Sequence, residues 1–261
     1  MGLKNITLGR FFPGNTITHK LDPRTKLIFL VLYIVAIFRA KTWLSYGILV
    51  AATAAIMAIS KIKPKNIITG LKPLLFIIVF TAVLNLFYTP GTPIKEGWII
   101  TYEGIEQCVR MILRITLLIT VTFVLTYTTS PMEITDGLEL LLNPLKKLKV
   151  PVHEMALMMS LALRFIPTLI DETDRIMSAQ KARGVDFESG NLIQRVRSLI
   201  PILVPLFISA FRRADELAVA MESRCYSGGT GRTRMNRLVM APRDYIAIAL
   251  VTAFMVLMII L

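Results

Sequence analysis

The stretch Lys26–Lys61, KLIFLVLYIVAIFRAKTWLSYGILVAATAAIMAISK, decides the fold class of this chain. Between the two flanking lysines its only charged residues are Arg39 and Lys41. A membrane-crossing helix takes about 20 apolar residues, and two cations at the centre of one such helix would be costly. We therefore predict a hairpin of two membrane helices, the first covering Thr25–Ile37 with its flanks and the second covering Trp43–Ser60.

The remaining long apolar runs predict three more membrane helices, over about Leu71–Tyr88, Cys108–Thr128 and Tyr245–Leu261. Apolar residues make up 54% of the 261 residues and the mean hydropathy is +0.63, which is too high for an ordinary water-soluble domain. We expect an all-α, polytopic membrane protein with about five transmembrane helices plus long cytoplasmic amphipathic coupling helices. The expected organisation is four transmembrane helices within residues 1–130, a cytoplasmic helical region at 131–243 and a last transmembrane helix at 244–261.

The net charge of +13 raises the choice between a nucleic-acid partner and a membrane surface. Outside residues 131–243 there are 14 Lys and Arg but only five Asp and Glu, so the cationic excess lies beside the apolar runs. Cytoplasmic flanks of membrane helices concentrate lysine and arginine in this way, and no basic patch alternates with aromatic residues as in a nucleic-acid groove. We therefore predict a multi-pass protein of the cell membrane that contacts lipid and no nucleic acid, with a cytoplasmic N-terminus and an extracellular C-terminus.

The segment between the fourth and fifth predicted spans is rich in leucine and methionine yet carries charges throughout. Ser130-Pro131 is typical of a helix start, with serine as the N-cap and proline at the first helical position. The apolar spacing that follows predicts a helix over Glu133–Lys149 with one apolar face. Two longer amphipathic helices are expected over His153–Arg183 and Leu192–Cys225.

Prolines within the two long helices predict irregularities. Pro167 should kink the first helix, and Pro201 and Pro205 should bend or break the second. An alternative is that His153–Ile170 and Leu199–Phe211 are two more membrane spans. The second of these is only 13 residues long, which suits a buried or re-entrant segment better than a span.

Patterns that would indicate catalysis or metal binding are weak. Gly228–Arg232 is glycine-rich but lacks the Lys-Ser/Thr ending of a phosphate-binding loop. The acidic run Asp171–Asp174 lies on a predicted helix whose turn divides the carboxylates between faces, which favours a solvated face. The two cysteines and two histidines have no metal-binding spacing. We therefore expect no catalytic residue, no metal ligand and no cofactor bound by this chain.

Two short segments, Ala182-Arg183-Gly184 and Ser223-Arg224-Cys225, are the best candidates for function. Each places an arginine between small residues late in a predicted helix, and the two arginines lie 41 positions apart. Small neighbours let a helix end approach a partner closely, and a guanidinium can form a forked bond to a carboxylate or a backbone carbonyl. The simpler interpretation is that each arginine only complements the dipole at a helix C-terminus.

These segments, together with His19–Leu27, HKLDPRTKL, carry a resemblance to a known family. The chain resembles the transmembrane T component (EcfT) of energy-coupling factor (ECF) transporters, which are ABC-type importers. His19–Leu27 is similar to an early motif of that family, and Ala182-Arg183-Gly184 is similar to its first Ala-Arg-Gly signature. Ser223-Arg224-Cys225 stands where the second signature belongs, although both residues beside the arginine differ. The resemblance covers nearly the whole chain.

The resemblance implies an L-shaped, non-enzymatic coupling subunit for the uptake of vitamins or other micronutrients. In such an importer two ABC ATPase subunits, A and A′, bind ATP, and the two arginine tips dock on them, Arg183 on one and Arg224 on the other. A separate membrane subunit, the S component, holds the substrate, and this chain transmits the ATP-driven movement to it. The docking residues so implied are Ala182, Arg183, Gly184, Ser223, Arg224 and Cys225.

Apolar side chains of the two long helices are candidates for contact with the S component, because methionine-rich surfaces adapt to different partners. The alternative is that these side chains belong to the core between the helices. Two other functions stay open for the whole chain, a self-sufficient membrane permease and a membrane-embedded enzyme. The candidate contact residues are Met155, Met158, Met159, Leu199, Leu203 and Leu206.

Overall fold

The computed structural model describes residues 11–92, 101–187, 191–228 and 238–261, and the regular elements among them are all helices, as predicted. These residues form two compact units. One contains residues 11–140 and 238–261, and the other contains residues 141–228. The L-shaped outline that the resemblance implies stays a prediction.

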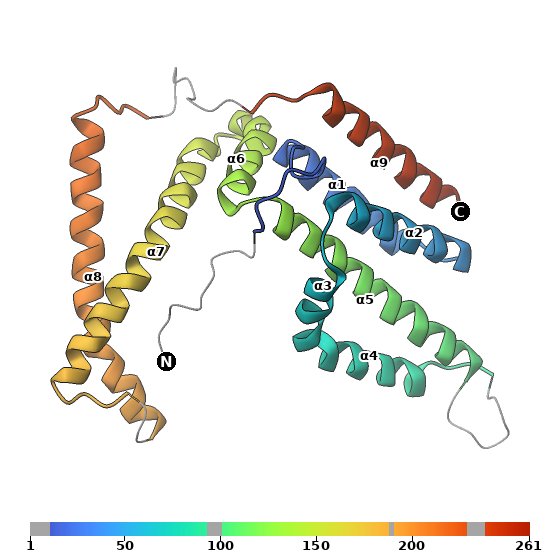
Figure 1. Cartoon of the computed structure of the whole chain (residues 1–261), viewed down its shortest axis with the longest axis horizontal. Coiled ribbons are helices and arrows are strands. Elements are labelled where there is room, and N and C mark those ends of the chain that lie inside the picture. The colour runs from blue at the N-terminus through green and yellow to red at the C-terminus, as the bar shows by residue number, and fades with distance from the viewer. Residues whose placement is uncertain (1–10, 93–100, 188–190, 229–237) are drawn as a thin grey trace. The chain divides into compact units, whose positions relative to one another are not determined.

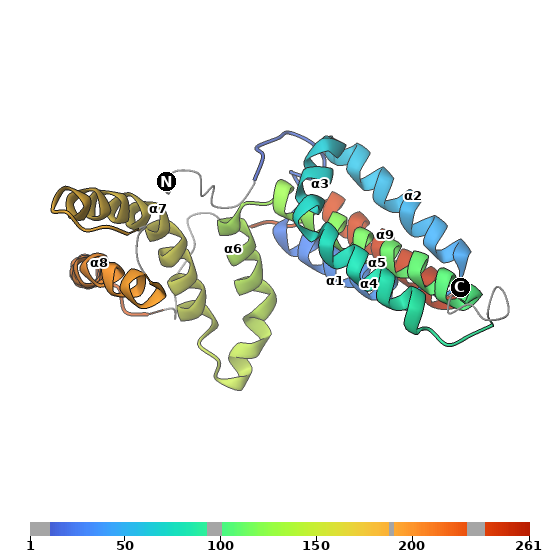
Figure 2. The same cartoon turned by 90° about the horizontal axis from the view of Figure 1, so that it is seen from below.

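The first unit is a bundle in which several helices run side by side (Figures 1 and 2). Helix α1 packs against α5 and α9, while α2, α3 and α4 each pack against α5. Helix α5 is therefore the central element of the bundle. The helices are α1 (Pro23–Arg39), α2 (Trp43–Ser60), α3 (Pro64–Leu71), α4 (Leu75–Tyr88), α5 (Tyr102–Thr128), α6 (Pro131–Leu142) and α9 (Pro242–Ile260).

The predicted spans agree with these helices to different degrees. Helix α2 has the predicted limits, whereas α5 begins at Tyr102 instead of Cys108 because the Thr101 hydroxyl caps it, accepting a 3.0 Å hydrogen bond from the Gly104 N–H. The expected span from Leu71 to Tyr88 is split by a short 3₁₀ turn, Lys72–Leu74, which contains a proline. Six helical segments among the described residues are long and apolar enough to cross a membrane: α2, α3 with α4, α5, α7, α8 and α9.

The number of crossing helices stays a prediction at this point. Helix α1 has only 17 residues and is not among the six, while α7 (Val152–Ala182) and α8 (Leu192–Glu222) are included. Length and composition alone therefore do not distinguish the five expected spans from the alternative with additional ones.

The core of the bundle lies where α1, α2, α5 and α9 meet. Tyr33 of α1 is 1% exposed, and its hydroxyl hydrogen-bonds to the Leu49 carbonyl at 2.9 Å and the Thr53 hydroxyl at 2.7 Å, both in α2. Its ring stacks on Phe254 of α9 with centroids 5.7 Å apart. Tyr33 thus joins three helices, and its buried hydroxyl group has two hydrogen-bond partners.

Two arginines near the start of α5 are held by the α1–α2 hairpin. Arg110 pairs with Glu106, one turn earlier, and lies 5.6 Å from the ring of Trp43. Arg114 donates a 3.0 Å hydrogen bond to the Tyr46 hydroxyl. These contacts inside the bundle explain how the two cations are tolerated on an apolar helix.

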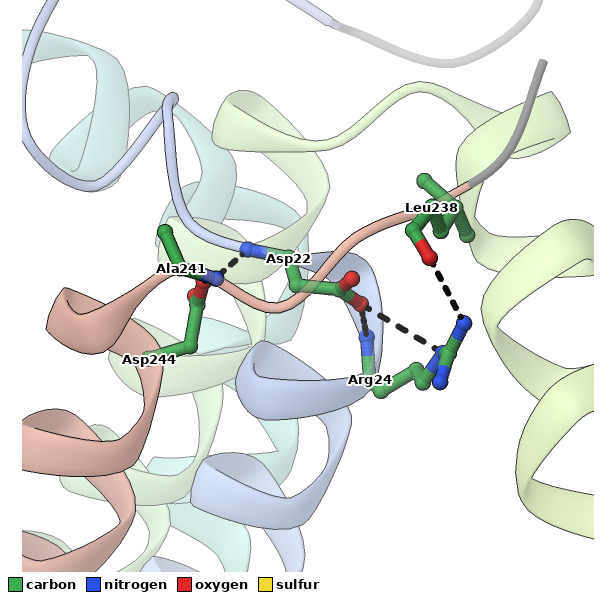
Figure 3. Close-up of polar contacts among 5 residues, drawn as sticks. All are labelled: Asp22, Arg24, Leu238, Ala241 and Asp244. Atoms are coloured by element: carbon green, nitrogen blue, oxygen red, sulfur yellow. Dashed lines mark hydrogen bonds and ion pairs between the residues drawn. The ribbon is translucent and has the colours of Figure 1, made fainter.

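The starts of α1 and α9 are joined through two buried carboxylates (Figure 3). Asp244, 1% exposed, accepts hydrogen bonds at 2.8 Å from the backbone N–H of both Asp22 and Ala241. Asp22 in turn accepts a 2.9 Å bond from the Arg24 N–H, and the Arg24 guanidinium reaches the Leu238 carbonyl at 3.2 Å. This aspartate clamp connects segments more than 200 positions apart in the chain.

Replacing Asp244 with Asn should destabilise the bundle by about 1–3 kcal/mol, because an amide nitrogen would face one of two buried N–H donors and leave it without an acceptor. Thermal unfolding of the detergent-solubilised chain would measure this loss. Asp171→Asn, on an exposed position of α7, is the matched control and should change stability by less than about 0.5 kcal/mol. Equal stability of both variants would show that the clamp contributes nothing.

Helix α6 begins as predicted and ends earlier. The Ser130 hydroxyl accepts from the Glu133 N–H at 3.2 Å, while the Glu133 carboxylate accepts from the Ser130 N–H at 3.0 Å, which is a capping box. The expected helix over Glu133–Lys149 is wrong at its end. Helix α6 stops at Leu142 and a 3₁₀ segment, Asn143–Leu148, follows, because Pro144 disfavours a helical residue before it and has no N–H of its own.

The second unit is built on two 31-residue helices, α7 and α8, which pack against each other as Figure 1 shows. Helix α8 starts with a capping box between Asn191 and Gln194. Helix α7 passes through Pro167, and α8 passes through Pro201 and Pro205 without a break. Of the two outcomes predicted for α8, a break is thereby excluded.

Candidate docking tips on the long helices

Helix α7 ends at Ala182 in a geometry that places Arg183 as its C-cap. The Gly184 N–H bonds to the Lys181 carbonyl at 3.0 Å and the Val185 N–H bonds to the Gln180 carbonyl at 3.1 Å. Gly184 has a φ of +85°, in the left-handed region. This pair of bonds with a left-handed residue is the Schellman termination, in which Arg183 is the C-cap.

Helix α8 ends in the same way, with Arg224 in the matching position. The Cys225 N–H bonds to the Glu222 carbonyl at 2.9 Å, and the Tyr226 N–H bonds to the Met221 carbonyl at 3.0 Å. Cys225 has a φ of +58°. The two predicted segments are therefore alike in backbone as well as in sequence, since each has an arginine directly before a left-handed residue.

The sequence pattern did not reveal this left-handed third position at the second tip. Glycine adopts that conformation freely, whereas a residue with a side chain pays about 1–2 kcal/mol. Glycine at 184 is therefore what the termination favours, and cysteine at 225 is a strained choice. The sequence predicted only that the residue after each arginine should be small. The structure adds that this residue must also adopt a left-handed conformation.

Both arginines are exposed, as are their flanking residues Ala182, Gly184, Ser223 and Cys225. Within the described part of the chain neither guanidinium has a hydrogen-bond or ion-pair partner. An exposed guanidinium can donate several hydrogen bonds to another molecule. This arrangement favours docking, although the dipole interpretation also places a cation at each helix C-terminus.

The two tips belong to opposite ends of the α7–α8 pair. Gln180, one turn before Arg183, lies beside Pro201 of α8, and Glu172, two turns earlier, binds Arg213 at 2.9 Å. The helices are therefore antiparallel. At a rise of about 1.5 Å per residue, the path along α8 from Pro201 to Arg224 covers roughly 35 Å. The tips are too far apart to hold one small ligand, and their spacing suits two separate protein surfaces.

The contact between Gln180 and Pro201 has a cause in the sequence. The Pro201 carbonyl would normally accept from the N–H of residue 205, but Pro205 has none. The freed carbonyl accepts instead from the Gln180 side chain at 3.4 Å. A proline in α8 thus provides an attachment point for the end of α7, a link that the sequence pattern did not indicate.

The candidate apolar residues lie mostly on the surface of the second unit. Among the three methionines of α7, Met158 is 61% exposed, and Met155 and Met159 are also exposed. On α8, Leu199 and Leu203 are exposed and Leu206 is half-buried. Five of the six side chains therefore do not belong to the core between these helices, and their contact with a partner stays a prediction.

One residue of the acidic run Asp171–Asp174 on α7 has a structural role. Glu172 forms the ion pair with Arg213, while the expected solvated face includes the exposed Asp171. The described residues hold no cluster of three or more metal-ligating side chains.

Comparison with known proteins identifies the family of this chain. A family model described as the cobalt transport protein CbiQ matches residues 14–235. The chain is 51% identical to the energy-coupling factor transporter transmembrane protein EcfT of Ruminiclostridium cellulolyticum, over 97% of this chain and 96% of the relative. It is 49% identical to EcfT of Bacillus subtilis, over 93% of this chain and 92% of the relative. The chain belongs to the CbiQ/EcfT family.

Membership of the CbiQ/EcfT family confirms the predicted resemblance. It also confirms the class of protein, a multi-pass transmembrane component of a transporter and not an enzyme. A third relative, EcfT of Lactococcus lactis, is 45% identical over 98% of both chains, so the likeness extends over the bundle and the long helices together.

Exchanging the left-handed residues should alter the two tips in opposite directions. Gly184→Ala should raise the hydrogen-exchange rate of the Val185 amide roughly tenfold, because strain of about 1–2 kcal/mol opposes the termination. Cys225→Gly should lower the exchange rate of the Tyr226 amide by a similar factor. Nothing lies within 4 Å of a Cβ added at Gly184, so a steric clash would not contribute. Amide exchange measured by mass spectrometry tests both, and unchanged rates would contradict the assigned termination.

Proposed function

We propose that this chain is the coupling subunit of an ECF-type ABC importer for a vitamin or another micronutrient. Arg183 and Arg224 would dock on two ABC ATPase subunits, A and A′, which bind ATP, whereas this chain itself binds no cofactor. The observation that carries the proposal is the shared termination of α7 and α8, which presents one exposed arginine at each of two distant tips.

Each tip suits a groove on a partner. A helix that ends in a left-handed small residue turns its chain away, so the arginine projects at the end without bulky neighbours. A guanidinium in a groove forms two parallel bonds with a carboxylate, or bonds to carbonyl oxygens at a helix end. Two tips of this kind, with a separation set by α8, require two binding surfaces, as a pair of ATPases provides.

The exposed apolar faces of α7 and α8 would contact the substrate-binding S component. Met155, Met158 and Met159 supply a flexible surface on α7, and Leu199, Leu203 and Leu206 supply the matching part of α8. The Gln180–Pro201 hydrogen bond joins the first tip to that part of α8. Movement of an ATPase would thereby reach the S component through the helix pair.

The charge distribution supports one orientation in the cell membrane. Lys20, Arg24 and Lys26 precede or begin α1, and Lys61–Lys65 follows α2, while Glu103 and Glu106 lie at the other end of the bundle. The ends rich in lysine would be cytoplasmic, which places the N-terminus inside and the C-terminus outside. Both arginine tips would then lie in the cytoplasm with the ATPases, and membrane lipid would surround the bundle.

Replacing both arginines tests the proposal. Arg183→Ala and Arg224→Ala should each weaken ATPase docking by about 2–5 kcal/mol, and the double variant should lose co-purified ATPases and transport. Membrane insertion should be unchanged, because both side chains are exposed. Arg197→Ala, at another exposed position of α8, is the matched control and should retain both properties. A double variant that still co-purifies with both ATPases and supports normal uptake would refute this function.

A further inference from the structure

Four helices of the bundle meet tightly at one end and separate at the other. Near the turn from α1 to α2, the core contains Ala36, Ile37, Tyr46, Leu117 and Met258, each at most 6% exposed. The Thr42 hydroxyl at this end also donates a 3.2 Å hydrogen bond to the Leu261 carbonyl. This end of α1, α2, α5 and α9 is therefore closed.

The opposite halves of the same four helices enclose an apolar cavity of about 410 Å³. It lies between the C-terminal halves of α2 and α5 and the N-terminal halves of α1 and α9. Ile59 and Leu250 line it and are 49% and 66% exposed, so the cavity opens on the outer surface of the bundle between α2 and α9. Further lining side chains include Phe29, Ile56, Val124 and Phe254.

One end of this cavity is polar. Thr25 lines it and is 1% exposed, and its hydroxyl has no hydrogen-bond partner among the described residues. The ammonium group of Lys26, a residue that is 7% exposed, donates to the Thr128 carbonyl at 2.9 Å and the His19 carbonyl at 3.4 Å. Because an ammonium group has three donors, one remains for a ligand. The cavity therefore combines a long apolar body with two hydrogen-bond donors at its end.

The apolar lining and the polar end of the cavity restrict the kind of molecule that can occupy it. Water is a poor candidate for the apolar body, since a buried water needs two to four polar partners. An empty void would deprive the lining of dispersion contacts. The bundle crosses a membrane, and the mouth is flanked by exposed apolar side chains, so lipid chains have direct access. An ester or phosphate oxygen, both of which accept hydrogen bonds, would match Thr25 and Lys26.

We propose that this cavity is a phospholipid site, which holds one acyl chain between α2 and α9 with the ester or phosphate oxygens at Thr25 and Lys26. The bound lipid fills the space that the diverging helices leave, and it stabilises the end of the bundle that carries the aspartate clamp. The site is formed by the bundle alone. It is therefore independent of the docking function proposed for Arg183 and Arg224.

The test uses the full chain in vesicles of phosphatidylethanolamine and phosphatidylglycerol that contain a phospholipid with a photoreactive diazirine in one acyl chain. Cross-linked peptides are identified by mass spectrometry as the labelled fraction increases. A bound lipid should label the α2 and α9 lining at low labelled fraction and reach saturation. Labelling that increases in proportion to the labelled fraction, without saturation, indicates only the surrounding bilayer and would overturn the site.

Two variants locate the lipid within the cavity. Ala52 lines it, so Ala52→Phe should fill the space and reduce saturable cross-linking about tenfold or more. Ala51→Phe adds the same ring at an exposed neighbouring position and should label like the unmodified chain. Thr25→Val removes a hydroxyl that has no hydrogen-bond partner within the described residues, and it should raise the half-saturating lipid fraction about fivefold. Unchanged saturable labelling in both Ala52→Phe and Thr25→Val would contradict the proposal. The saturation test uses the unmodified chain, so it does not depend on the folding of either variant.

Discussion

The structure of the membrane bundle depends on one constraint: each backbone N–H group at a buried helix N-terminus requires a hydrogen-bond acceptor. Asp244 satisfies two such groups, one at the start of α9 and one just before α1, and so fixes the last helix against the first. A neutral side chain with one acceptor cannot replace it. Because α1 also contacts α5, the clamp indirectly sets the position of α9 relative to the central helix.

The same requirement at helix ends creates the candidate docking tips. The last carbonyls of α7 and α8 are satisfied by N–H groups of a chain that turns back through a left-handed residue. That turn leaves the preceding arginine at the extreme end of the helix. Cys225 keeps the turn despite its side chain, so the geometry is maintained at the second tip where glycine is absent.

Local sequence patterns predicted many of the helices and their ends, but they did not predict contacts between segments that are distant in the sequence. The limits of α2, the N-cap at Ser130 and both arginine segments follow from neighbouring residues and were predicted from the sequence, whereas the reciprocal bond from Ser130 to Glu133 was not. The apolar spacing continues to Leu148 and so predicts a longer helix than Pro144 allows, which is why the early end of α6 differs from the prediction. Asp22 and Asp244 are 222 positions apart, and no local pattern indicates that they meet.

Proline gives α8 a property that an uninterrupted helix would lack. A regular helix uses each interior carbonyl internally, so a neighbouring helix can attach only through side chains. Pro205 frees the Pro201 carbonyl, and Gln180 occupies it. The bond lies one turn from Arg183, so a force applied at that tip reaches the backbone of α8 through the Gln180 side chain. The partly buried Glu172–Arg213 ion pair, at 2.9 Å, adds a second and charge-assisted link between the two helices. Under the proposed function, the hydrogen bond at Pro201 and this ion pair together make the two helices act as one lever.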